Sequence, residues 1–200
     1  MKKKSGGIRA SVQLSMGEYI ETFASLVHEH YQRAMSDEEL FSALNLTEEA
    51  QAQFSVEYAT VLLVIASLAF KVKPKLTTDK YRDRIQERMA DGSFRKILTD
   101  ADDETIAACV TFYQTKKQIF SEICKNIYST AAANRQRDIV GFARMLVAQV
   151  HPDDEEANLK AVERIGILLS GATDTFITLV SNSVQDSIRM DGKPTFAVLK

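Results

Sequence analysis

The sequence predicts an all-α fold: a single-domain bundle of about six to eight helices around a central apolar helix at about residues 54–72. Three observations support this class. Only 3 Pro and 8 Gly occur among 200 residues, so few positions disfavour helix. Residues 59–70 contain no charged side chain. Residues 104–132 carry two adjacent rows of mainly apolar side chains at helical spacing. The length suits one hydrophobic core.

Residues 59–70 are the most apolar stretch of the chain. A helix that is apolar on all sides must be surrounded by other helices or by lipid. Twelve helical residues extend roughly 18 Å, which is less than the ~30 Å hydrocarbon layer of a membrane. Glu57 precedes this stretch and Pro74 follows it. We therefore expect a core helix and no membrane insertion.

The first residues differ in character from the remainder. Residues 1–7 are expected to form a flexible basic arm, and residues 8–200 a single helical domain. No apolar run follows the lysines after Met1, so we expect no secretory signal and a cytoplasmic location. Cys109 and Cys124 on one helix would lie roughly 22 Å apart, too far for a disulfide. Free thiols are typical of a reducing cytosol.

Strict alternation in residues 8–14 predicts a short strand. Apolar side chains occupy every second position, with Arg9, Ser11 and Gln13 between them. Residues 195–199 also suit a strand, since β-branched and aromatic side chains are frequent there. A lone strand is not stable. We therefore expect these segments to pair with each other, or the first strand to pair with its copy in a dimer.

Two capping boxes mark helix starts early in the chain. Residues 15–18 open a helix that reaches about Met35, and residues 36–39 open a short helix. The acids after Thr47 favour the start of the central helix, because negative charge is stabilised at a helix N-terminus.

Helical patterns continue to the C-terminal region. A helix is expected to begin at Asp79 and to end at residues 91–92, Asp-Gly. A separate amphipathic turn is expected after it. A long helix is predicted at residues 104–132, and Asn134 interrupts the chain before the next one. The last helical pattern runs from about residue 153 to Met190.

The predicted helix at 104–132 has two apolar rows, which indicate a buried face wider than a coiled-coil seam. The first row consists of Ile106, Val110, Tyr113, Lys117, Phe120, Cys124, Ile127 and Ala131. The second consists of Cys109, Phe112, Lys116, Ile119 and Ile123. This pattern favours bundle packing.

The residue pattern gives little evidence for a metal site or a catalytic site. His28 and His30 are two positions apart, so on a helix they point in different directions. The two cysteines lack Cys-x-x-Cys spacing, and ordinary buried thiols are expected. The sequence contains no Gly-rich phosphate loop, zinc spacing or nucleophile elbow. We therefore expect no enzyme activity, no metal and no cofactor.

Asp174 is the only charged residue between Ile165 and Gln185. An unpaired carboxylate in a buried helix would be costly or would have a raised pKa. One hypothesis is a ligand- or proton-binding group in a pocket of the bundle. The other is a structural carboxylate that pairs with Arg or Lys, or reaches water.

Residues 71–96 contain nine bases and four acids, whereas residues 18–49 contain eight acids and one base. The basic segment predicts a surface for an anionic partner. Its residues are Lys71, Lys73, Lys75, Arg82, Arg84 and Arg88. The partner is either nucleic acid, through phosphate contacts, or the acidic surface of a protein. Because residues 18–49 would provide such a surface on another copy, self-association is expected.

The basic arm, the alternating strand and the capped helix together resemble the opening of ribbon-helix-helix DNA-binding proteins. The resemblance covers residues 2–30 and implies that Arg9, Ser11 and Gln13 face the major groove. Two features depart from the family pattern: the first helix is long, and residues 36–39 are acidic where a phosphate would dock.

The function predicted first is that of a non-enzymatic helical interaction, assembly or regulatory protein that self-associates as a homo-oligomer. Two alternatives are a nucleic-acid-binding regulator that uses the ribbon and the basic segment, and a bundle that binds a small ligand near Asp174.

Overall fold

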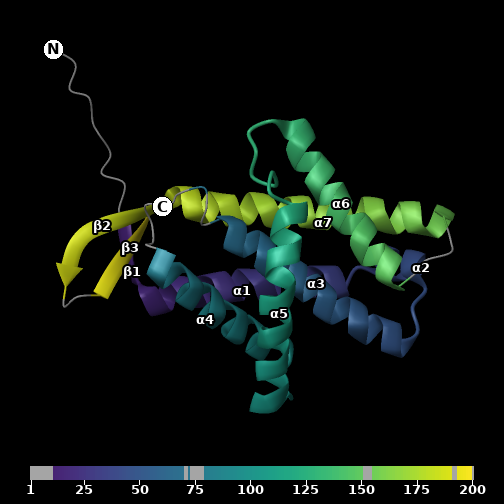
Figure 1. Cartoon of the computed structure of the whole chain (residues 1–200), viewed down its shortest axis with the longest axis horizontal. Coiled ribbons are helices and arrows are strands. Elements are labelled where there is room, and N and C mark those ends of the chain that lie inside the picture. Colours follow the sequence, from purple (N-terminus) through teal and green to yellow (C-terminus); the bar gives the residue numbers. More distant parts are fainter. Residues whose placement is uncertain (1–10, 70–71, 73–78, 151–154, 191–192, 200) are drawn as a thin grey trace.

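The computed structural model describes residues 11–69, 72, 79–150, 155–190 and 193–199. This part of the chain is an all-α multi-helix bundle with a small sheet at one end (Figure 1). Its helices are α1 (Met16–Met35), α2 (Glu38–Leu44), α3 (Glu48–Ala69), α4 (Asp79–Ile97), α5 (Asp103–Ile123), α6 (Ala132–Val150) and α7 (Glu155–Asn182). Its strands are β1 (Ser11–Ser15), β2 (Ser183–Met190) and β3 (Lys193–Leu199). The predicted fold class is confirmed.

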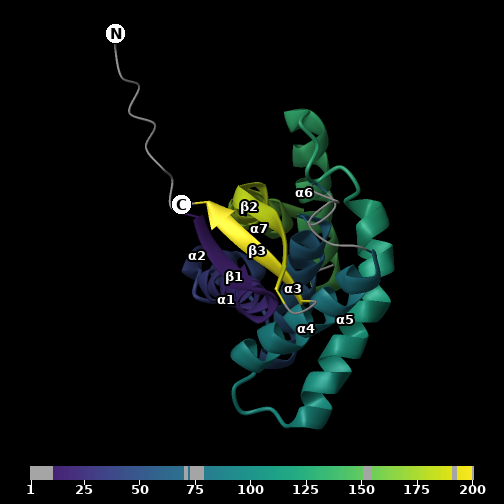
Figure 2. The same cartoon turned by 90° about the vertical axis from the view of Figure 1, so that its left-hand side faces the viewer.

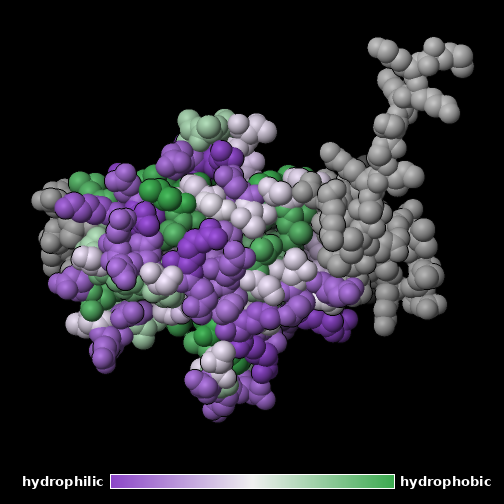
Figure 3. All heavy atoms as spheres, turned by 180° about the vertical axis from the view of Figure 1, so that it is seen from behind, coloured by the Kyte–Doolittle hydropathy of each residue, from purple (hydrophilic) through white to green (hydrophobic). Residues whose placement is uncertain are grey.

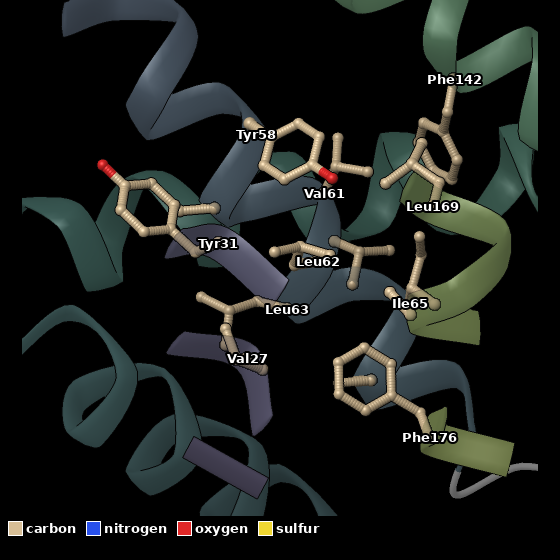
Figure 4. Packing of buried hydrophobic residues seen from close by; sticks show 14 of the residues in the cluster. Val27, Tyr31, Tyr58, Val61, Leu62, Leu63, Ile65, Phe142, Leu169 and Phe176 are labelled. Carbon is tan, nitrogen blue, oxygen red and sulfur yellow. The ribbon is translucent and has the colours of Figure 1, made fainter. Parts of the chain in front are cut away.

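Helix α3 is the centre of the bundle, as the apolar stretch predicts. Every residue from Glu57 to Ala69 is buried, and α1, α4, α5, α6 and α7 all contact α3. Figure 4 shows Val27, Phe142 and Phe176 directed at this helix from three different elements. By length and composition alone α3 would suffice to cross a membrane, but 78% of its most apolar window is buried inside the protein.

Helices α1 and α2 follow the predicted pattern with one correction at a cap. Tyr19, Phe23 and Val27 are each 0% exposed and lie four residues apart, so they share one face of α1. Helix α2 is capped by Asp37, whose carboxylate accepts a hydrogen bond from the Leu40 N–H at 2.8 Å. The predicted cap at Ser36 is therefore wrong by one residue.

The predicted end of a helix at Asp91-Gly92 is also wrong. Helix α4 continues through both residues to Ile97 and includes the buried Phe94. A Cβ atom added at Gly92 would lie 3.4 Å from the Cβ of Ala24. This is close to an ordinary van der Waals distance, so the contact by itself does not require a glycine. Packing of α4 against α1 outweighs the ~1 kcal/mol by which glycine disfavours helix.

Helix α5 is shorter than predicted because a turn separates it from α6. The helix ends at Ile123, and α6 begins at Ala132, before Asn134. The buried carboxylate of Asp138 accepts a hydrogen bond from the Asn126 N–H at 2.7 Å. A side chain from the following helix thus stabilises the turn, which the local sequence does not reveal.

The three strands form one antiparallel sheet in the order β1-β3-β2, visible in Figure 2. Strand β1 pairs with β3, with Ser11 opposite Leu199. The predicted pairing of the two terminal segments is therefore confirmed. The prediction that helix extends to Met190 is wrong, because α7 ends at Asn182 and residues 183–190 form β2. Strand β3 offers two edges, and β2 occupies the second.

His30 gives the bundle a pH dependence. Its ring is 5% exposed and lies 5.8 Å from the ring of Phe176, measured between centroids. Burial lowers the pKa of His30; Arg33 lowers it further, and Glu29 raises it. An unfolded histidine has a pKa near 6.5. As the pH falls below that value, the unfolded chain binds a proton that the folded protein resists, so stability is lost.

We expect His30→Gln to reduce the loss of unfolding free energy between about pH 7.5 and pH 5.5, the range around an ordinary histidine pKa. His28→Gln is the matched control, since His28 is less buried and bonds to Gln32 on the same helix. Urea unfolding at several pH values measures the slope. An unchanged slope in His30→Gln contradicts this assignment.

Candidate functional site

Helix α5 directs its two lysines toward the bundle. Lys116 Nζ lies 3.3 Å from Glu57 Oε1 on α3. The same ammonium group lies 5.1 Å and 5.7 Å from the ring centroids of Phe112 and Phe120. Glu57 is 6% exposed, and its other carboxylate oxygen has no hydrogen-bond partner among the described residues. Lys116 therefore neutralises a charge that α3 carries into the core.

Lys117, the next residue of α5, contacts side chains of α4. Its ammonium group donates a hydrogen bond to the side-chain oxygen of Gln86 and lies 3.5 Å from Asp83 Oδ1. Gln86 in turn donates to the carbonyl of Ser67 at 3.4 Å. A set of polar side chains thus connects α5 with α4 and α3.

Tyr113 completes the contact between α5 and α3. Its hydroxyl is hydrogen-bonded to Ser67 Oγ at 2.5 Å. Burial raises the pKa of Tyr113 well above its ordinary value, and the Ser67 hydroxyl lowers it by a smaller amount. The phenol therefore keeps its proton at neutral pH. These groups satisfy one another and form a structural contact rather than a reactive site.

The outer face of α5 carries no charge between its first turn and Glu122. We call this surface the neutral face. It consists of the exposed residues Thr105, Ala107, Ala108, Thr111, Gln114, Thr115, Gln118 and Ile119. Ile119 is 56% exposed. The hydroxyl of Thr111 donates to the carbonyl of Ala107 at 2.9 Å, and that of Thr115 to the carbonyl of Thr111 at 3.0 Å.

Between residues 105 and 119 the charge distribution of α5 differs from that of an ordinary surface helix. Such a helix turns apolar residues inward and charged residues toward water. Helix α5 crosses the front of the molecule in Figure 1 and lies at its edge in Figure 2, yet Lys116 and Lys117 contact groups of α3 and α4 while the neutral face is outside. The opposite side of the molecule shows hydrophilic side chains over much of its middle (Figure 3).

A second exposed apolar area lies between α6 and α7. Leu159 and Ile167 on α7 are 62% and 57% exposed. They line a shallow groove together with Val140, Val162 and Gly166. The groove also contains charged side chains from α7, so it is less uniform than the neutral face.

Asp174 does not lie in the core. Its side chain is 66% exposed, and Oδ1 lies 3.6 Å from Nη1 of Arg135. Helical periodicity explains the position, because Thr173 and Phe176 point inward while Asp174 is on the outer side of α7. The premise of a buried Asp174 is therefore wrong, whereas ligand binding near it stays a prediction. The structural alternative, a carboxylate that pairs with arginine, agrees with this contact.

The basic segment is only partly described. Lys71, Lys73 and Lys75 lie outside the described residues, and of Arg82 only the backbone in α4 is described. Arg84 and Arg88 are exposed on α4.

The last two bases of that segment are paired with acids. Arg95 bonds to Asp91 at 3.1 Å and to Asp103 at 2.8 Å. Lys96 lies 2.6 Å from Glu21 of α1. Contacts within the chain therefore neutralise this end of the segment. Its predicted role as an anionic-partner surface stays a prediction.

The predicted DNA-reading ribbon is likewise described in part. Arg9 lies outside the described residues, and Ser11 and Gln13 are placed by their backbone in β1. That strand pairs with β3 of the same chain. The described ribbon is therefore intramolecular.

The described residues contain no group of three or more His, Cys, Asp or Glu side chains that would hold a metal ion. Cys124 is buried, and its Sγ donates to the carbonyl of Phe120 at 2.8 Å. Burial raises the pKa of the half-buried Cys109 thiol. Cys109 therefore does not have the lowered pKa that marks a reactive cysteine.

The prediction of two buried rows on α5 is only partly right. The two apolar rows correctly place Ile106, Tyr113 and Phe120 inside. The prediction that Ile119 and Ile123 belong to the buried face is wrong, since they are 56% and 42% exposed. The available signal was the absence of charge at every outward position from 105 to 119.

Comparison of the chain with protein-family models, with curated proteins and with solved structures found no match.

Proposed function

We propose that the protein is a non-enzymatic helical interaction module that binds another protein chain through the neutral face of α5. The observation that supports this proposal is the charge distribution of α5: its two lysines pair with carboxylates of α3 and α4, and its exposed residues from 105 to 119 are uncharged. Cores of protein–protein interfaces are depleted of charged residues in the same way.

The chemistry of the neutral face lowers the cost of binding a protein. Burying an unpaired charge or an unsatisfied hydroxyl destabilises a complex. The face has no charge, and the hydroxyls of Thr111 and Thr115 already donate within the helix. Ile119 contributes apolar area, which is favourable to remove from water.

Nucleic-acid binding has less support. A phosphate-binding surface requires Lys or Arg side chains free to contact the backbone. The neutral face has none, and Arg95, Lys96, Lys116 and Lys117 each contact a carboxylate of the same chain. Exposed bases such as Arg84 and Arg88 of α4 favour the alternative.

A photo-crosslinking amino acid placed at Gln118 tests the proposal in cells that express the protein. We expect an adduct with a protein, because Gln118 is an exposed residue of the neutral face. The matched control is the same substitution at Gln51, an exposed glutamine on α3, which should give none.

Absence of an adduct at Gln118, or equal adducts at both positions, would contradict the proposal. An adduct that disappears on nuclease treatment would support the nucleic-acid alternative instead. Mass spectrometry of the adduct identifies the partner.

A further inference from the structure

We infer that the partner of the neutral face is a second copy of this chain, with the two α5 helices packed antiparallel about a twofold axis at Thr115. This inference rests on the proposed function and adds the identity and geometry of the partner. Three features of α5 support it: the residue at the axis, the sizes of its neighbours, and the charges at the helix ends.

Thr115, at the centre of the neutral face, can pack against Thr115 of a second copy. At a twofold axis a residue meets the same residue of the partner, so a charge there would be repelled. Thr115 is exposed, uncharged and bonded within its own helix. The neighbouring lysines point away from Thr115: Lys116 pairs with Glu57 of α3, and Lys117 contacts Asp83 and Gln86 of α4.

The sizes of the side chains on either side of Thr115 suit antiparallel packing. Thr111, Thr115 and Ile119 form a ridge at four-residue spacing, the type of ridge that interdigitates in the commonest class of helix packing. An axis at Thr115 places Thr111 of one copy opposite Ile119 of the other. A small residue opposite a large one fills space efficiently. Parallel packing would instead oppose Ile119 to itself.

The charges at the helix ends favour the same orientation. Glu104 in the first turn and Lys125 just after the last turn are both exposed. Antiparallel packing brings Glu104 of one copy near Lys125 of the other, and Glu122 opposite Ala108. Parallel packing would oppose Glu104 to Glu104 and Glu122 to Glu122, which is unfavourable. Opposed helix dipoles also favour the antiparallel arrangement.

The contact should be weak. A stable interface involves about 20–30 residues on each partner, and the neutral face has eight. We therefore expect a monomer–dimer equilibrium in the micromolar range rather than a permanent dimer.

Sedimentation equilibrium of the purified chain over a range of micromolar concentrations tests the inference. The wild type should change from monomer to dimer. Thr115→Arg should weaken the dimer by about tenfold or more, because like charges then meet at the axis. Gln51→Arg is the matched control: it adds the same charge at an exposed residue of α3, outside the neutral face, and should leave the equilibrium unchanged.

An equal mixture of Thr115→Arg and Thr115→Glu copies should restore the dimer, because opposite charges then face each other across the axis. Circular dichroism confirms that each variant remains folded. Failure of the mixture to restore association, or a dimer insensitive to Thr115→Arg, would overturn the axis at Thr115. A wild type that stays monomeric would overturn self-association; an adduct of Gln118 with a different protein would then leave the proposed function intact.

Discussion

Replacement of Leu62 by alanine is expected to lower the free energy of unfolding by about 2–5 kcal/mol, the range for large-to-small substitutions in a core. Leu62 is 0% exposed in the middle of α3, and Figure 4 shows it among Val61, Leu63 and Ile65. The loss has two parts: apolar area that is no longer buried, and a cavity that rigid helices on every side fill only partly.

The matched control is Gln53→Ala, at an exposed position of the same helix. It should change the unfolding free energy by less than about 0.5 kcal/mol, as surface substitutions usually do. Urea denaturation followed by circular dichroism measures both variants. Equal effects at the two positions would contradict the placement of α3 at the centre of the bundle.

Replacement of Lys116 by methionine is expected to lower the free energy of unfolding by about 3 kcal/mol, at the lower end of the range for breaking a buried ion pair. The lower end applies because the Lys116 side chain keeps 27% exposure, whereas that of Glu57 keeps 8%. The cost arises chiefly from the Glu57 carboxylate, which then lacks a cation in a poorly hydrated site.

The double variant Glu57→Met, Lys116→Met separates this explanation from a loss of packing. Replacing a whole buried pair by apolar residues is often neutral or stabilising, so the double variant should regain most of the lost stability. Arg88→Met, which removes an exposed cation from α4, should have little effect. A double variant as unstable as Lys116→Met alone would show that the pair does not account for the loss.

The inward lysines and the neutral face are two consequences of one arrangement. Lys116 and Lys117 join α5 to α3 and α4 through charged and polar contacts. The outer side of the helix therefore lacks the cations that would otherwise keep it hydrated. The contacts of the two lysines with α3 and α4 therefore determine that the exposed side of α5 is uncharged, although these lysines would not touch a partner themselves.

Much of the fold follows from periodicity. The four-residue spacing of Tyr19, Phe23 and Val27 predicts the buried face of α1, and the charge-free residues 59–70 predict a helix covered on all sides. The alternation in residues 8–14 predicts β1. These features are local, and burial of an apolar face dominates the energetics of folding, so the predictions hold without knowledge of the neighbours.

The errors occur where a distant segment decides the outcome. Gly92 does not end α4, because α1 packs against it. Helix α5 ends at Ile123, where Asp138 of α6 holds the turn. Residues 183–190 form a strand because the free edge of β3 supplies its hydrogen bonds. In each case tertiary contacts outweigh a local preference.

The same division applies to the candidate site. The sequence by itself determined which residues of α5 are uncharged and that Lys116 and Lys117 belong to otherwise apolar rows. Only the tertiary structure decided that both lysines find carboxylates on α3 and α4, that Ile119 is outside, and that Asp174 is exposed beside Arg135. The physical reason is that a helix has a fixed periodicity, but the side that faces the core depends on which neighbours pack against it.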